Sequence, residues 1–146
     1  MSIFLTIFAG VVTYVLGQLV MKLIIEPVHE FKRVIANISH SLIEYANVYS
    51  NPGITGNDNE KNVSTVTRKL SSQLNAQIYL IPHYELTSKI FGLPPRKIVA
   101  QAALYLIGLS NSVGKSAANI DLASNNAEKV GKIRVLLDIY VPKEDR

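Results

Sequence analysis

The first feature of the hydrophobic pattern is an uninterrupted apolar stretch. From Ser2 to Met21 no residue is charged, and most are Ile, Leu, Val, Phe or Ala. Twenty helical residues rise roughly 30 Å, which is the thickness of the hydrocarbon core of a bilayer. We therefore predict a transmembrane helix over residues 2–25. A cleaved signal peptide and a buried core helix are the alternatives, although no basic n-region precedes the stretch and no Ala-x-Ala-like site follows it.

Apolar residues continue beyond this stretch at spacings of three and four, which predicts a second helical segment from about residue 26 to about Ser50. Asn51, Pro52 and Gly53 are expected to end it. Pro27 is predicted either to kink the long helix or to break it in two. The spacing is typical of a packed or coiled helix, and we call its apolar residues the seam. We expect oligomerisation around the seam, which consists of Val28, Phe31, Ile35, Ile38, Leu42, Tyr45 and Tyr49.

The remaining pattern predicts three longer helices and one short one. Ser64 is the expected N-cap of a helix that ends near Ile81, and a helix from about Arg96 follows the Gly- and Pro-rich residues 92–95. Residues 114–126 are predicted to be a connector before the last helix. No strand-like alternation of useful length occurs, so the expected fold class is all-α, with residues 26–146 forming one helical domain. The apolar positions of the helix that ends near Ile81 are Val66, Leu70, Leu74 and Ile78, and those of the short helix are Tyr84, Leu86, Ile90 and Phe91. The helix from Arg96 has Ile98, Ala102, Tyr105, Leu106 and Leu109, and the last helix has Val130, Ile133, Leu136 and Leu137.

The charge distribution predicts the orientation in the membrane. Every charged side chain follows the apolar stretch, beginning with Lys22, Lys32 and Arg33 on its C-terminal side. Because Lys and Arg are retained in the cytoplasm, the helical domain is expected there. Its net charge of +4 suits an anionic ligand or the inner leaflet, although it is also common on ordinary soluble surfaces.

Small and polar residues recur on one face of the apolar stretch. In a membrane, small residues occur where helix backbones approach closely, so this stripe predicts contact with other helices. One interpretation is a simple packing face, for a dimer or another membrane protein. The other is a homo-oligomer whose stripe borders a narrow pore, with threonine hydroxyls facing the ions; the carboxamide of Gln18 favours it slightly. The stripe consists of Thr6, Gly10, Thr13, Gly17 and Met21.

Five basic residues are candidates for binding an anion or a nucleic acid. Those at helix starts gain from backbone N–H groups, and tyrosines could stack on bases. The alternative is a solvated basic face, with the tyrosines in the core or in an interface. The five candidates are Arg68, Lys69, Arg96, Lys97 and Lys115, and the tyrosines are Tyr45, Tyr49, Tyr79, Tyr84 and Tyr105.

The sequence gives little support for catalysis. His29, His40 and His83 lack metal-ligand spacing, and the chain has no cysteine. No nucleophile–base arrangement can be assembled. We therefore expect neither an enzyme nor a metal or cofactor site.

Three stretches of the chain carry a resemblance: 17–27 (GQLVMKLIIEP), 45–52 (YANVYSNP) and 106–112 (LIGLSNS). The pattern resembles small bacterial one-span membrane proteins, and it looks like the membrane effector of Hailong-type antiphage defence. Those effectors are oligomeric channels held shut by single-stranded DNA oligomers that a partner nucleotidyltransferase makes. The resemblance implies a homotetramer in the bacterial inner membrane whose N-terminal helices form the conduction path. The candidate ligand residues come from the charge pattern and not from this resemblance.

The leading hypothesis is therefore a homo-oligomeric channel subunit in the bilayer, gated through its cytoplasmic helices by an anionic ligand. The alternative is a membrane-anchored helical interaction protein without a pore.

Overall fold

The computed structural model describes residues 2–113 and 120–140, and every regular element in these ranges is a helix. The all-α prediction is confirmed for this part of the chain. In order, the elements are α1 (Ser2–Val20), the π-helical turn η1 (Met21–Ile25), α2 (Glu26–Glu44), α3 (Ala46–Ser50), α4 (Asn57–Leu80), α5 (Tyr84–Phe91), α6 (Arg96–Ser112) and α7 (Ile120–Leu136).

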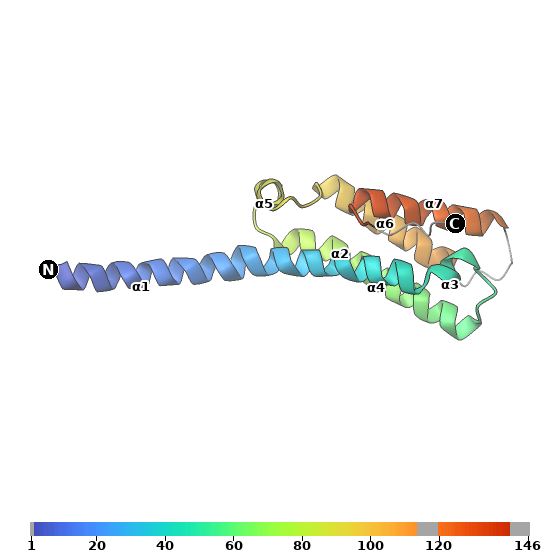
Figure 1. Ribbon diagram of the computed structural model, residues 1–146, viewed down its shortest axis with the longest axis horizontal. Helices are drawn as coiled ribbons and strands as arrows, with labels where there is room; N and C mark the ends of the chain where they lie inside the picture. The colour runs from blue at the N-terminus through green and yellow to red at the C-terminus, as the bar shows by residue number, and fades with distance from the viewer. Residues whose placement is uncertain (1, 114–119, 141–146) are drawn as a thin grey trace.

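The N-terminal elements form one continuous helix, and its first half projects away from the rest of the protein (Figure 1). This helix is long and apolar enough to cross a membrane, and none of its most apolar stretch is buried within the protein. A core helix of a soluble domain would bury such a stretch, so the buried-core alternative is wrong.

Pro27 neither breaks the long helix nor separates two elements, because it lies in the first turn of α2. Its ring nitrogen cannot donate a hydrogen bond and its ring crowds the carbonyl four residues earlier. The preceding turn widens instead: the N–H of Glu26 donates to the carbonyl of Met21, five residues back. A single π-helical turn thus accommodates the proline within a continuous helix.

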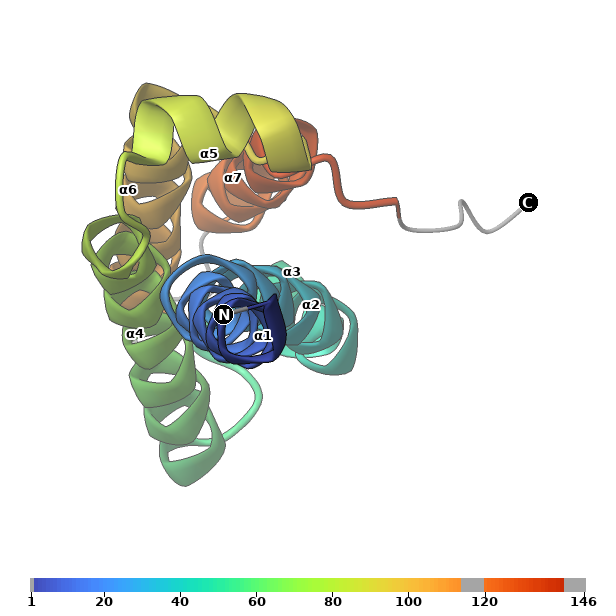
Figure 2. The same ribbon diagram turned by 90° about the vertical axis from the view of Figure 1, so that its left-hand side faces the viewer.

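The second half of the long helix belongs to a helical bundle. α2 packs on α4, α4 on α6 and α6 on α7, while α3 contacts α7. Figure 2 shows this bundle from the end at which α1 emerges. Within the predicted seam, Phe31 and Ile38 are fully buried in this core, and Tyr45 ends α2 where one unbroken helix was predicted. The seam is therefore that of a packed helix, since the chain's own helices cover it. Oligomeric contacts around it are not shown.

The chain enters α4 eight residues earlier than predicted, because Asn57 and not the residue after Ser64 begins the helix. Glu60 explains the difference. Its carboxylate is buried and accepts hydrogen bonds from the N–H groups of Gly53 (2.9 Å) and Thr55 (3.1 Å) and from the Thr55 hydroxyl (3.0 Å). These bonds fold the preceding loop back onto the first turn of α4, which local propensity alone did not indicate.

The predicted connector over residues 114–126 is also partly wrong, because α7 begins at Ile120. Residues 114–119 lie outside the described part of the chain. Asn126 is fully buried in α7, where its amide donates to the carbonyl of Tyr49 (3.0 Å) and its oxygen accepts from the hydroxyl of Ser112. One side chain thus ties α7 to both α3 and the end of α6.

Asn126→Ala is expected to lower the free energy of unfolding by about 1–3 kcal/mol, because it leaves buried polar groups without partners. Denaturant unfolding of the detergent-solubilised protein, followed by circular dichroism, measures this loss. Asn125→Ala is the matched control, since the neighbouring asparagine is exposed and its loss should change stability by less than about 0.5 kcal/mol. Equal stabilities of the two variants would contradict the structural role given to Asn126.

Candidate functional site

A polar groove runs along one face of α4 and ends against Val113, just after α6. Its α4 residues are spaced by three and four, so they share one side of the helix. Three of them are cationic and the others carry hydroxyl or amide groups. The groove encloses about 640 Å³ and is lined by Asn57, Lys61, Ser64, Thr65, Arg68, Lys69 and Ser72 in addition to Val113.

Contacts between α4 and α6 hold the groove in place. The Ser64 hydroxyl donates to the carbonyl of Ser110 (2.7 Å), and the guanidinium of Arg68 donates to the side-chain oxygen of Asn111. Deeper in the same interface, the buried hydroxyl of Ser71 donates to the carbonyl of Ala103 (2.7 Å). The Arg68 guanidinium is therefore partly preorganised, and Lys61 and Lys69 are exposed beside it. Such a cluster suits a phosphate, because each cation can pair with phosphate oxygens.

Of the four predicted cations that the structure describes, two line the groove, namely Arg68 and Lys69. Arg68 lies beside Asn111 near the end of α6, whereas Arg96 and Lys97 open the same helix. Fifteen helical residues separate Arg96 from Asn111, or about 22 Å. Within one protomer the candidates thus form two groups, and Lys115 lies outside the described residues.

Sequence reasoning missed Lys61, Ser64 and Thr65 as groove residues. With the helix start placed at Ser64, Lys61 fell in a loop and its alignment with Arg68 was hidden. The signal that could have found it is the spacing Lys61, Thr65, Arg68 and Lys69, which is regular only if the helix begins earlier.

The tyrosines do not supply a stacking platform for the groove, since none of its described lining residues is aromatic. Tyr49 is buried and hydrogen-bonds with the hydroxyl of Thr67 (2.8 Å), while the Lys132 ammonium lies 5.3 Å from the centre of the Tyr105 ring. Tyr79 is exposed at the far end of α4. Any nucleic acid in this groove would therefore be held through its phosphates.

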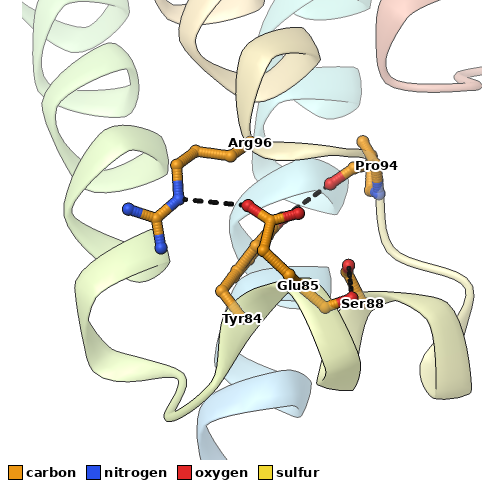
Figure 3. Close-up of polar contacts among 5 residues, drawn as sticks. All are labelled: Tyr84, Glu85, Ser88, Pro94 and Arg96. Atoms are coloured by element: carbon orange, nitrogen blue, oxygen red, sulfur yellow. Dashed lines mark hydrogen bonds and ion pairs between the residues drawn. The ribbon is translucent and has the colours of Figure 1, made fainter.

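Tyr84 belongs to the second cationic group (Figure 3). Its hydroxyl donates to the carbonyl of Pro94 (2.7 Å), and the guanidinium of Arg96 lies 5.7 Å from its ring centre and 3.6 Å from the carboxylate of Glu85. Burial raises the pKa of Tyr84 to about 12; the Glu85 carboxylate adds to this shift and Arg96 opposes it. Arg96 is thus engaged with its own chain, which makes it a weaker ligand candidate than Arg68.

The raised pKa of Tyr84 predicts a loss of stability at alkaline pH. An unfolded tyrosine loses its proton near pH 10, whereas the folded one keeps it until about pH 12. Between these values the unfolded state binds fewer protons, so the free energy of unfolding falls as pH rises, and it is unaffected below pH 10. Denaturant unfolding at pH 8 and pH 11 should show a smaller fall for Tyr84→Phe than for wild type. Tyr79→Phe, at an exposed position, should keep the full fall; an undiminished fall in Tyr84→Phe would contradict the argument.

The stripe on α1 is the second candidate site. All five of its residues are exposed, so the chain's own described residues leave this face uncovered. A Cβ atom added to Gly10 or Gly17 would meet nothing within 4 Å beyond the adjacent residues and the backbone of its own helix. Packing within one chain therefore does not explain the small size of these two residues. Close packing against a neighbouring helix would explain it, because such packing requires small residues.

Comparison with known proteins adds no assignment. We found no family model, no curated protein and no solved structure that matches this chain. The function must therefore be argued from α1 and the groove on α4.

Proposed function

We propose that this chain is a subunit of a homo-oligomeric ion channel in the bacterial inner membrane. The channel acts in antiphage defence, and it is gated by a nucleotide or nucleic-acid ligand of its cytoplasmic domain. The observation that carries the proposal is the exposed stripe on α1. Its Gly10 and Gly17 are not required by a close approach of any other described part of the chain. In an oligomer, these residues let helices approach closely around a narrow path bordered by Thr6 and Thr13.

The continuous helix supports a coupling between ligand and pore. α4 carries the groove and packs on α2, and α2 continues through η1 into α1 without a break. A ligand that binds one arrangement of α4 and α2 more tightly shifts the population toward that arrangement. Movement of α2 is then transmitted to α1 because the two are parts of one helix.

The proposed ligand is a single-stranded DNA oligomer that holds the channel shut, and the proposed source is a partner nucleotidyltransferase. Lys61, Arg68 and Lys69 support an anion of this kind, since phosphates at successive positions can pair with cations along one helix face. A homotetramer would repeat the groove four times around the axis, and the fields of the repeated grooves would add.

The test is ion flux through purified protein in liposomes, together with a voltage-sensitive dye in cells that express the chain. Ligand-free protein should release a trapped ion gradient, and added single-stranded oligonucleotide should slow this release. Cells without the nucleotidyltransferase should depolarise. No flux with or without oligonucleotide, from protein shown to be inserted, would reject the pore and favour the membrane-anchored interaction protein.

A further inference from the structure

The short helix α5 has an unusual position in the fold. Figure 2 looks along the N-terminal helix, and α5 lies crosswise over the end of the bundle from which α1 emerges. In Figure 1 the same helix is seen end-on beside the long helix, at that end. The chain turns into α5 through His83 and out of it through Gly92, both in the left-handed backbone region (φ 47° and 64°). A chain that only had to connect α4 to α6 would not require this helix.

One face of α5 is fastened to the bundle. Tyr84 packs its ring against that of Phe31 (6.1 Å between centres). Its hydroxyl donates to the carbonyl of Pro94, as Figure 3 shows. The buried hydroxyl of Thr87 donates to the carbonyl of Pro82 (2.9 Å). At the end of the helix, the N–H of Leu93 donates to the carbonyl of Ser88 (2.8 Å), which closes α5 with a glycine cap. These contacts fix the rotation of α5 about its own axis.

The opposite face of α5 carries large apolar side chains that nothing in the described chain covers. Leu86 is 63% exposed and Ile90 is 68% exposed. At about 100° per residue, both project away from the buried positions 84, 87 and 88 and from the partly buried position 91. Tyr79 and Leu80, at the adjacent end of α4, are 75% and 60% exposed. Exposed apolar side chains are thus clustered at one end of the bundle, which marks an interaction surface.

The level of this surface matches the place where the membrane is expected to end. Lys22 is the first charged residue after the apolar part of the long helix. Phe31, which contacts Tyr84, lies nine residues later, or about 14 Å along the helix axis. Figure 3 shows Tyr84 extending from α5 toward Pro94, and Figure 1 shows α5 beside the long helix at the end of the bundle from which α1 emerges. This places α5 beside the headgroup region.

Exposed cations accompany the apolar side chains. Lys89 is exposed on α5 itself, and Lys97 is exposed at the start of α6. Apolar residues next to Lys, on a helix lying in the interfacial plane, are typical of helices that bind membrane surfaces. Anionic headgroups of the inner leaflet attract such cations. A tyrosine such as Tyr79 is also common at this depth.

We propose that α5 lies on the surface of the bilayer, with Leu86 and Ile90 inserted among the lipid headgroups. This inference rests on the proposed membrane span of α1 but not on the presence of a pore. Lipid is the occupant because the surface is continuous with the segment that enters the membrane. Contact with the bilayer then fixes the orientation of the bundle relative to the membrane, because the chain is held both by the span of α1 and by the surface contact of α5.

The experiment uses the full-length chain in liposomes, and it exploits the absence of tryptophan from the sequence. Leu86→Trp and Ile90→Trp each introduce a single fluorophore. Phe8→Trp reports on α1, and Ile54→Trp is the control at an exposed apolar position in the loop before α4. Emission is compared between ordinary phospholipid and phospholipid brominated near the headgroup end of its acyl chains, because bromine quenches tryptophan on contact.

The expected result is strong quenching and a blue-shifted emission at positions 86 and 90, approaching the quenching at position 8, with none at position 54. Unquenched emission at 86 and 90 beside a quenched position 8 would overturn the proposal and leave the membrane span intact. A blue shift without quenching would also overturn it, because a second protein copy would then cover α5. If position 8 is unquenched as well, the span fails together with the proposal that rests on it.

Discussion

If the chain forms the proposed channel, Gly17→Leu is expected to abolish most of the membrane depolarisation seen with the wild type. A leucine side chain on the stripe would separate helices that must approach closely, and it would project into any path bordered by Thr13. The change should not harm the protomer, since an added Cβ at position 17 meets nothing within 4 Å beyond the adjacent residues and the backbone of its own helix. Replacing glycine within a helix also removes a propensity penalty of about 0.8–1.0 kcal/mol. A loss of activity would therefore report on contacts between subunits.

The matched control is Val15→Leu. Val15 is exposed on the face of α1 opposite Gly17, where a longer apolar side chain faces lipid. It should depolarise cells as the wild type does, at equal protein levels in the membrane fraction. Wild-type depolarisation by Gly17→Leu would contradict a pore built on the stripe. Equal loss in both variants would instead indicate a general defect of insertion.

The long apolar helix could be predicted from sequence because its signal lies in composition alone. An uncharged stretch of sufficient length needs no knowledge of its neighbours. The bounds of α5 and α6 could also be predicted, since Pro82, Gly92 and Pro95 interrupt the chain at the points where the helices change direction. These elements are determined by local chemistry.

The start of α4 could not be predicted because a buried carboxylate determines it. Glu60 is polar and lies among Asn, Asp and Lys, so the sequence there resembles a solvated loop. Its three hydrogen bonds to Gly53 and Thr55 become visible only when the loop is folded. The groove was incompletely predicted for the same reason, because Lys61 joins Arg68 only in the longer helix.

The burial of Asn126 likewise depends on tertiary structure. Asparagine within Ser124, Asn125 and Asn126 is typical of a connector, and nothing local distinguishes the buried residue from its exposed neighbours. Its partners are Tyr49, in α3, and Ser112, at the end of α6. Only a fold that brings these residues together makes position 126 helical and buried.

Removal of one groove cation is expected to weaken the binding of single-stranded DNA and to reduce its dependence on salt. Each phosphate paired with a cation contributes about −0.7 to the slope of log affinity against log salt for a single strand, so three cations per groove give a slope of about −2. Arg68→Gln should therefore make this negative slope shallower by about 0.7 per groove. Glutamine preserves a hydrogen-bond donor for Asn111, so the α4–α6 contact should persist.

Titration of a fluorescent oligonucleotide with purified protein, followed by anisotropy at 50 and 300 mM salt, measures both quantities. Lys32→Gln removes an exposed cation on α2 and should leave them unchanged. Arg96→Gln distinguishes the two cationic groups, since Arg96 lies about 22 Å along α6 from Asn111, the hydrogen-bond partner of Arg68. If Arg96→Gln weakens binding and Arg68→Gln does not, the ligand binds at the end of the bundle from which α1 emerges. If the wild-type affinity is equal at both salt concentrations, phosphates make no contact with either group, and the groove is an ordinary solvated face of α4.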